Sequence, residues 1–227
     1  MNTLKYIYDE LLEQDPRCTD KGVGFNSHIG LYEDLLSSYR DKPIKLFEVG
    51  VNRGGSVKMW QRYFEKAQIY GLDIREKVIR RKQLDRISLL KVDQSSESEL
   101  LNFGKKYGDF DIGIDDGSHV WKHQILTFEC LWPHIRSGGL YVIEDVLTSY
   151  PNYKENRAAR KGGKTITKYG NLQGEIDAVS YFQHLIDEIN LYGKDDDISS
   201  LSYNQRSIEW ILFRHNSIAI KKKYVTS

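Results

Sequence analysis

One short stretch of the chain constrains the fold more than any other, because it joins a strand-like run to a glycine turn. The apolar run Leu46–Val49 ends at Gly50, and a glycine pair then leads into a helix-like pattern that begins at Ser56. Glycine suits such a turn because it accepts backbone conformations that a side chain forbids and lets a ligand approach the bare backbone. The stretch therefore predicts a strand, a tight turn and a helix start beside a crevice, with the acid Glu48 at its mouth.

The rest of the chain alternates strand-like and helix-like segments. Short apolar runs at 69–74, 87–92, 110–116 and 140–145 are separated by helical patterns, and the runs 207–214 and 217–220 flank a turn. This order is typical of a doubly wound sheet whose crossover helices cover both faces. We expect an α/β fold with a mostly parallel, seven-stranded, Rossmann-like sheet that ends in an antiparallel C-terminal β-hairpin.

The 227 residues are enough for one α/β domain with appendages. We expect residues 1–42 to form an N-terminal helical cap and loop, and residues 43–227 to form the catalytic domain. A loop before the first core strand can fold over a ligand, so its residues Asp20 and His28 are either functional or ordinary surface residues. The basic segment 151–175 is either a lid over the substrate or a solvated loop.

Charge and cysteine usage narrow the function classes. Lys and Arg number 33 against 32 Asp and Glu, a net charge of +1, so no global field favours nucleic acid as a partner. Cys18 and Cys130 lie far apart, which argues against a disulfide framework and for a reducing compartment. No apolar run approaches the length of a membrane span, and Met1 is followed by a polar segment. We expect a cytoplasmic protein.

Polar residues that close the second and third strands predict a nucleoside-containing ligand. Asp73 ends the second strand roughly twenty residues beyond the turn, where a carboxylate meets ribose hydroxyls. Asp93 and Gln94 end the third strand, beside the expected position of the base. Asn52 replaces the second glycine of the dinucleotide fingerprint, and Glu48 suits a cationic sulfonium better than a phosphate. S-adenosylmethionine is therefore favoured over NAD.

Acidic residues end the fourth and fifth strands. Asp115 and Asp116 precede a glycine turn and His119, while Glu144 and Asp145 close the next strand. Because parallel strands bring their carboxyl ends to one edge, these side chains can converge in space. Adjacent residues at a strand end point to opposite sides, so Asp115 is more simply a cap of the turn than a ligand.

These motifs together resemble the catalytic domain of the metal-dependent macrolide and sugar O-methyltransferases, from about residue 20 to the C-terminal hairpin. The Asp-Asp-Gly-Ser-His and Ile-Glu-Asp motifs are more specific than the glycine turn. The resemblance rests on Phe47–Val51, Gly54–Ser56, Met59–Trp60, Ile69–Asp73, Asp93–Gln94, Ile114–His119, His134, Gly138–Asp145 and Thr148–Tyr150.

The resemblance implies a class I methyltransferase that uses S-adenosylmethionine and a divalent ion, usually Mg²⁺, to methylate a sugar hydroxyl. It implies that Asp116, Glu144 and Asp145 bind the metal, and that His119 acts with Asp116 in catalysis as the general base. The residues expected to contact the cofactor are Glu48, Gly50, Asn52, Ser56, Asp73, Ile74, Asp93, Gln94 and Asp115.

The acceptor is the least constrained part of the prediction. We expect a glycan or a small glycosylated natural product, and the basic stretch 154–168 points to an anionic or nucleotide-linked sugar. Two alternatives stay open: methylation of a catechol or another vicinal diol, which the same metal would serve, and a non-catalytic nucleotide-binding scaffold. A homo-oligomer is possible.

Overall fold

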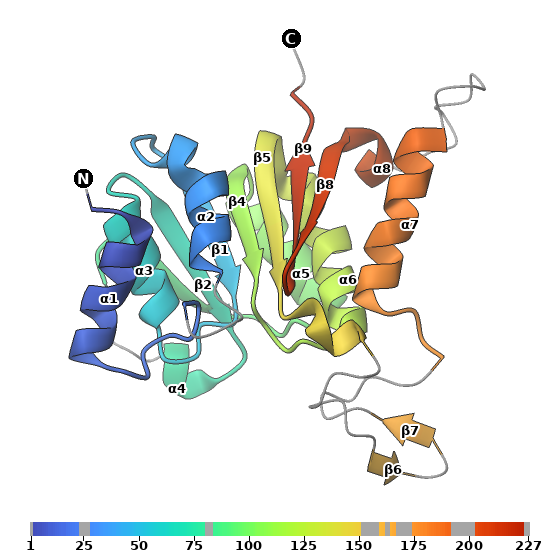
Figure 1. Cartoon of the computed structure of the whole chain (residues 1–227), viewed down its shortest axis with the longest axis horizontal. Coiled ribbons are helices and arrows are strands. Elements are labelled where there is room, and N and C mark those ends of the chain that lie inside the picture. Colours follow the sequence, from blue (N-terminus) through green and yellow to red (C-terminus); the bar gives the residue numbers. More distant parts are fainter. Residues whose placement is uncertain are drawn as a thin grey trace.

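The structure is a computed structural model that describes residues 2–22, 28–79, 84–150, 159–161, 164–166, 174–191 and 203–224. A seven-stranded sheet in the order β3-β2-β1-β4-β5-β9-β8 forms its centre (Figure 1). Strands β1 to β5 pair in parallel, and β9 runs antiparallel to both β5 and β8. The strands are β1 (Lys45–Val49), β2 (Gln68–Asp73), β3 (Ile87–Lys91), β4 (Phe110–Asp115), β5 (Ile135–Glu144), β8 (Ile208–Arg214) and β9 (Ser217–Lys222).

The predicted sheet, with its antiparallel terminal hairpin, is confirmed. The chain order reverses between β1 and β4, which lie side by side at the middle of the sheet. A doubly wound sheet binds its ligand at this switch point, beyond the carboxyl ends of the strands. The turn after β1 and the acids after β4 therefore meet where a ligand is expected.

Helices cover both faces of the sheet (Figure 1). Leu46 and Phe47 are adjacent in β1 yet belong to opposite hydrophobic clusters, because successive strand residues point to opposite faces. One face packs against α1 (Leu4–Gln14), α2 (Ile29–Leu36), α3 (Gly55–Tyr63) and α4 (Glu76–Ile79). The other packs against α5 (Glu97–Tyr107), α6 (Trp121–Leu131) and α7 (Ala178–Leu191). Burial on both faces explains the near-continuous apolar runs.

The N-terminal helices pack directly onto the sheet. Leu4 of α1 and Tyr32 of α2 are fully buried in the cluster that also contains Leu46 of β1. The side chain of Thr3 caps α1 by accepting from the backbone N–H of Tyr6. The two helices thus belong to the same core as the sheet, and the proposed domain boundary at residue 42 stays a prediction.

Two elements differ from the sequence expectations. Strand β5 begins at Ile135, five residues early, because Ile135 pairs with Phe110 before a register shift in β4. The basic stretch 75–84 predicts a helix that reaches Leu84, whereas the described helix spans Glu76–Ile79 and Leu84 forms a bridge with Ile87.

The remaining elements are short. They are the 3₁₀ helices η2 (Ser37–Tyr39), η3 (Trp132–His134) and η4 (Val146–Ser149), the helix α8 (Tyr203–Ser207), and the strands β6 (Ala159–Lys161) and β7 (Lys164–Ile166). Strands β6 and β7 pair with each other apart from the main sheet (Figure 1). Most of the basic segment 151–175 lies outside the described residues, so the expected lid stays a prediction. None of the helices in the described ranges is long and apolar enough to cross a membrane.

Candidate functional site

The turn after β1 packs against the end of β4. Gly50 has a φ of +92°, and a Cβ atom placed on it would lie 1.9 Å from the carbonyl oxygen of Asp116. Two backbone hydrogen bonds bring the neighbouring strands to this point, from Gly50 to Leu72 and from Asp116 to Val49. Glycine is required here for both its conformation and its lack of a side chain. The close approach fixes the backbone of Asp116 beside the crevice.

Asp73 is the last residue of β2 and lines the crevice. Its carboxylate accepts from the backbone N–H of Asn52 at 3.0 Å and from the Arg75 guanidinium at 2.9 and 3.0 Å. Burial alone would raise the pKa of Asp73, but the hydrogen bonds from Arg75 and Asn52 bring it below its usual value. Asn52 has a φ of +46°, which asparagine tolerates better than most residues. The turn thus presents an ionised acid to the crevice.

A cavity of about 540 Å³ extends along the carboxyl edge of the sheet. This volume is ordinary for a small-molecule or cofactor site. Ten of the residues that were predicted from the sequence line it, namely Gly50, Asn52, Ser56, Asp73, Ile74, Asp93, Gln94, Asp116, His119 and Asp145. Cofactor candidates and catalytic candidates therefore share one cavity. Asp20 also lines it, as a loop folded over a ligand would.

Asp115 is not in the cavity wall. It is fully buried, and both of its carboxylate oxygens accept from the amide of Gln94, at 2.7 and 2.9 Å. It also accepts from the backbone N–H of Gly117, as expected for a cap of the turn. Gln94 in turn accepts from the N–H of Ser118 at 2.8 Å. Asp115 positions Gln94, which does line the cavity, and the expected contact between Asp115 and a cofactor stays a prediction.

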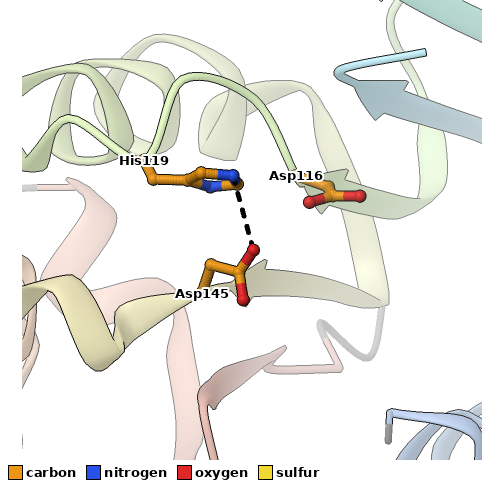
Figure 2. Close-up of side chains that lie close together, drawn as sticks. All are labelled: Asp116, His119 and Asp145. Carbon is orange, nitrogen blue, oxygen red and sulfur yellow. Dashed lines mark ion pairs between the residues drawn. The ribbon is translucent and has the colours of Figure 1, made fainter. Parts of the chain in front are cut away.

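Three side chains form an open group at the cavity: Asp116, His119 and Asp145 (Figure 2). Each offers an atom that lies within 4.8 Å of the others, and His119 Nε2 is 3.4 Å from Asp145 Oδ2. The imidazole points into the space between the two aspartates, which come from the ends of β4 and β5 (Figure 2). This places two hard oxygen donors and an imidazole on one side of the cavity.

Backbone conformation turns two of these residues into the cavity. His119 and Asp145 have φ values of +56° and +57°, a region that non-glycine residues seldom occupy. The hydroxyl of Thr148 donates to the backbone carbonyls of both residues, at 3.3 Å each. Unfavourable backbone conformations of this kind persist only where the surrounding structure holds them, and they cluster at functional sites.

Asn216 fixes the Asp145 carboxylate from the C-terminal hairpin. Its Nδ2 donates to Asp145 Oδ1 at 2.6 Å, and its Oδ1 accepts from the backbone N–H of Leu147 at 2.9 Å. Asn216 is buried in the turn between β8 and β9. The antiparallel hairpin therefore contributes to the site as well as completing the sheet.

A second acidic group, which we call the buried group, shares Asp116 with the open group. Glu48, Asp116 and Glu144 also offer atoms within 4.8 Å of one another. The Lys21 ammonium lies among them, with Nζ 2.5 Å from Glu144 Oε1, 2.9 Å from Asp116 Oδ2 and 3.1 Å from Glu48 Oε1. The Tyr32 hydroxyl donates to the same oxygen of Glu144 as Lys21.

The ionisation of this buried group is set by burial and by the lysine. Burial alone would lower the pKa of Lys21, but the carboxylates around it raise that pKa well above its usual value. Burial would raise the pKa of Glu144, yet the Lys21 ammonium brings it below the usual value. For Asp116, burial and the neighbouring carboxylates outweigh Lys21, and its pKa rises well above normal. The site thus carries more carboxylates than its own cation can balance.

The predicted metal set does not form one group among the described residues. Asp116 and Asp145 lie in the open group, whereas Glu144 lies in the buried group with Glu48. Neither Glu48 nor Glu144 lines the cavity. The metal role of Glu144 and the cofactor contact of Glu48 therefore stay predictions.

The sequence analysis does not predict a role in the site for three residues: Lys21, the hydroxyl of Tyr32, and Asn216. The sequence allows either a functional or a surface role for His28, and the surface role is wrong. It is buried, with Nδ1 2.7 Å from Ser217 Oγ and Nε2 3.5 Å from Glu144 Oε2. The polar, glycine-containing loop at residues 19–28 was the only sequence feature that pointed to N-terminal residues in the site.

No protein-family model matches the chain. Curated relatives do match it, including demethylmacrocin O-methyltransferase of Streptomyces fradiae, at 33% identity over 199 residues, 84% of this chain and 47% of the relative. Mycinamicin VI 2''-O-methyltransferase of Micromonospora griseorubida is 35% identical over 201 residues, with 84% and 47% covered. The chain thus spans about half the length of these relatives.

A solved structure agrees with the sequence relatives. The methyltransferase MycE of mycinamycin biosynthesis, in complex with Mg, SAH and mycinamycin VI, superposes with a TM-score of 0.76 at 28% identity. The match covers 98% of this chain and 55% of that one. The resemblance drawn from the motifs is confirmed. The chain is a relative, in sequence and in fold, of the macrolide and sugar O-methyltransferases.

Proposed function

We propose that the chain is the catalytic part of a methyltransferase that moves a methyl group from S-adenosylmethionine to a sugar hydroxyl of a glycan or glycosylated natural product, with Mg²⁺ as a second cofactor. One observation carries the proposal: a single cavity is lined both by the predicted cofactor residues and by Asp116, His119 and Asp145. Methyl transfer requires the donor and the acceptor hydroxyl to meet in one space.

The cofactor half of the cavity suits a nucleoside with a cationic side arm. Asp73 is an ionised acceptor for ribose hydroxyls, and Asp93 and Gln94 line the cavity where the base is expected. Gly50 lines the same cavity, at the turn beside which we place the methionine part of the cofactor. The MycE relative was solved with SAH, the product of this cofactor.

The open group fits a divalent ion. Asp116 and Asp145 supply hard carboxylate oxygens, the donors that Mg²⁺ prefers, and the pKa of Asp116, raised by burial and by neighbouring carboxylates, marks negative charge that a cation would balance. We propose that these two residues bind the ion directly, and that Glu144, the third residue of the predicted metal set, adds its negative charge from the buried group. When bound, Mg²⁺ would lower the pKa of a hydroxyl that it coordinates. The MycE structure also contains Mg.

His119 is the residue that takes the proton. Its imidazole lies in the cavity wall beside both aspartates, at the distance from Asp145 that lets the carboxylate orient the ring (Figure 2). Asn216 holds Asp145, and Thr148 holds the backbone of both residues. The chain therefore supports its base through contacts from β5, η4 and the terminal hairpin.

The proposal also covers the acceptor, the oligomeric state and the cellular compartment. Two further relatives are named as O-methyltransferases of L-olivosyl-oleandolide and of a rhamnosyl tetracenomycin-C, which supports a glycosylated small molecule as the acceptor. Lys161 lies in β6 and Lys164 in β7. We propose this basic segment as the part of the chain that binds an anionic group of the acceptor. A homo-oligomer and a cytoplasmic location remain predictions; both cysteines are free.

Calorimetry followed by a transfer assay tests the function. Calorimetry should show that the chain binds S-adenosylhomocysteine. With S-adenosylmethionine and Mg²⁺, the chain should methylate a glycosylated macrolide, and adding EDTA to remove Mg²⁺ should abolish product formation. The aglycone and catechol serve as comparison acceptors. Product from catechol alone would favour the vicinal-diol alternative. No binding of S-adenosylhomocysteine, with or without Mg²⁺, would remove both enzymatic readings, and binding without transfer to any acceptor would favour a scaffold.

A further inference from the structure

Lys21 is the most unusual residue of the site, because its charge is almost completely removed from solvent. The side chain is 1% exposed, and its Nζ contacts one oxygen from each of Glu48, Asp116 and Glu144. These acids come from β1 and from the ends of β4 and β5, the three central parallel strands. Lysines are almost never buried to this extent without such partners.

The three contacts match the chemistry of an ammonium group. An ammonium is a compact charge with three donors, and here it meets three carboxylates at 2.5, 2.9 and 3.1 Å. Without it, three acids with atoms within 4.8 Å of one another would face each other in a buried pocket. Oxygen-rich clusters of that kind are the sites that divalent cations occupy in proteins.

Asp116 links this buried group to the open one. Its Oδ2 is held by Lys21, while the same carboxylate belongs to the group with His119 and Asp145. The backbone of Lys21 is also fixed, since its carbonyl accepts from the N–H of His28 at 2.7 Å. Lys21 therefore determines where the shared carboxylate lies relative to the cavity.

We propose that Lys21 is a positioning residue that fills a cation site with the protein's own ammonium. It holds Glu48, Asp116 and Glu144 together before any ion binds, and it confines a divalent ion to the open side at Asp116 and Asp145. This rests on the proposed metal site. It follows that the wild-type chain binds one divalent ion, and that removing the ammonium creates a second site in the buried group.

A purely structural role for Lys21 makes a different prediction. If the lysine only fastened the N-terminal segment to the sheet, its removal would loosen the fold and weaken metal binding. If it replaces a cation, its removal leaves uncompensated carboxylates and strengthens cation binding. The two roles therefore differ in the sign of the change in metal affinity.

The test measures Mn²⁺ binding by electron paramagnetic resonance of the free ion, in wild type, Lys21→Ala and Lys21→Met. Lys5→Met is the matched control, because Lys5 is an exposed lysine of α1 paired only with Asp9 among the described ion pairs. We expect one Mn²⁺ per chain in wild type and Lys5→Met. Lys21→Ala should bind a second Mn²⁺, and Lys21→Met, which keeps the side-chain volume, should bind Mn²⁺ at least tenfold more tightly than wild type.

Stability supplies a readout that does not depend on activity. Lys21→Ala should be stabilised by Mn²⁺, or by propylammonium, which replaces the deleted atoms, and Lys5→Met should not respond to propylammonium. If the variants fold only when one of these cations is present, the proposal also stands. The proposal is wrong if neither cation stabilises the variants or restores their folding. It is also wrong if the variants bind the same number of Mn²⁺ ions as wild type with the same affinity.

The same experiment separates this inference from the proposed function. Absence of Mn²⁺ from wild type would remove the proposed metal site, whereas gain of an ion in Lys21→Ala would still support the role of Lys21. One Mn²⁺ in wild type with no change in Lys21→Ala would leave the proposed function intact and overturn only the inference.

Discussion

The Nδ2 of Asn216 donates a hydrogen bond to Asp145 Oδ1 at 2.6 Å, across 71 residues of sequence. Asn216 lies in the turn of the terminal hairpin and Asp145 at the end of β5, so the last two strands fix an acid of the proposed site. Because Asn216 also accepts from the N–H of Leu147, its amide holds both the carboxylate and the backbone that follows it.

We predict that Asn216→Gly lowers kcat about tenfold, as expected for the loss of one hydrogen bond to a charged group, which contributes roughly 1.5 kcal/mol. Glycine tolerates the φ of +56° at this position, so the turn is retained. Binding of S-adenosylhomocysteine should not change. Asn216→Asp should be more harmful, because it places a carboxylate against Asp145. Equal activity of both variants and wild type in steady-state kinetics would contradict this role.

His119→Asn should lower kcat by about two to four orders of magnitude, the usual contribution of a general base. Asparagine tolerates the positive φ of this residue, so the loop backbone is preserved. Calorimetry should show unchanged binding of S-adenosylhomocysteine. His123→Asn is the control, since His123 also lines the cavity and contacts Ser118. A full kcat for His119→Asn with its true acceptor would show that another group takes the proton.

Gly50→Ala should destabilise the fold by about 2 kcal/mol or more, because it combines a positive φ with a clash. The new Cβ would lie 1.9 Å from the carbonyl oxygen of Asp116, so the proposed metal site should also be displaced. Gly30→Ala in α2 is the control, since no atom lies within 4 Å of its added Cβ. Chemical denaturation should show Gly30→Ala at or above wild-type stability. Similar effects of both substitutions would be evidence against the close approach.

Asp115 should make stability depend on pH in the metal-free protein. Burial raises the pKa of Asp115 to about 7, whereas the unfolded chain has a value of about 3.9. Between those values the folded state holds a proton that the unfolded state releases, so stability falls as pH rises from about 4 to 7. Asp115→Asn should therefore gain stability relative to wild type as pH rises through this window.

Denaturation in EDTA at pH 5 and pH 8 measures this difference. We expect the advantage of Asp115→Asn over wild type to be larger at pH 8 by at least about 1 kcal/mol, well below the roughly 4 kcal/mol that a three-unit shift allows. Asp9→Asn, at an exposed pair with Lys5, is the control. A difference that is independent of pH would mean that Asp115 is ionised in the folded protein throughout the range.

The sheet and the strand-end acids were predictable because they depend on local patterns. Apolar runs of strand length mark strands buried on both faces, and parallel strands must bring their carboxyl ends to one edge. Gly50, Asp73 and Asp116 follow directly from that rule. The alternation of neighbouring side chains also predicted the cap role of Asp115 correctly.

Alternation also separates Glu144 from Asp145: adjacent side chains at the end of β5 point to different sides, one into the buried group and one into the open group. The metal role of Glu144 stays a prediction. Lys21 and Asn216 were missed. Lys21 is 95 residues from Asp116 and Asn216 is 71 residues from Asp145, and a contact over that separation depends on how the helices and the hairpin pack.

The most direct test of the account is a crystal structure with Mn²⁺ and S-adenosylhomocysteine, in which anomalous scattering locates the ion. The account predicts one Mn²⁺ peak in the cavity, bound by the carboxylates of Asp116 and Asp145 beside the S-adenosylhomocysteine sulfur, with the Lys21 ammonium still among Glu48, Asp116 and Glu144. A peak in the place of that ammonium, or no peak in the cavity at saturating Mn²⁺, would contradict it.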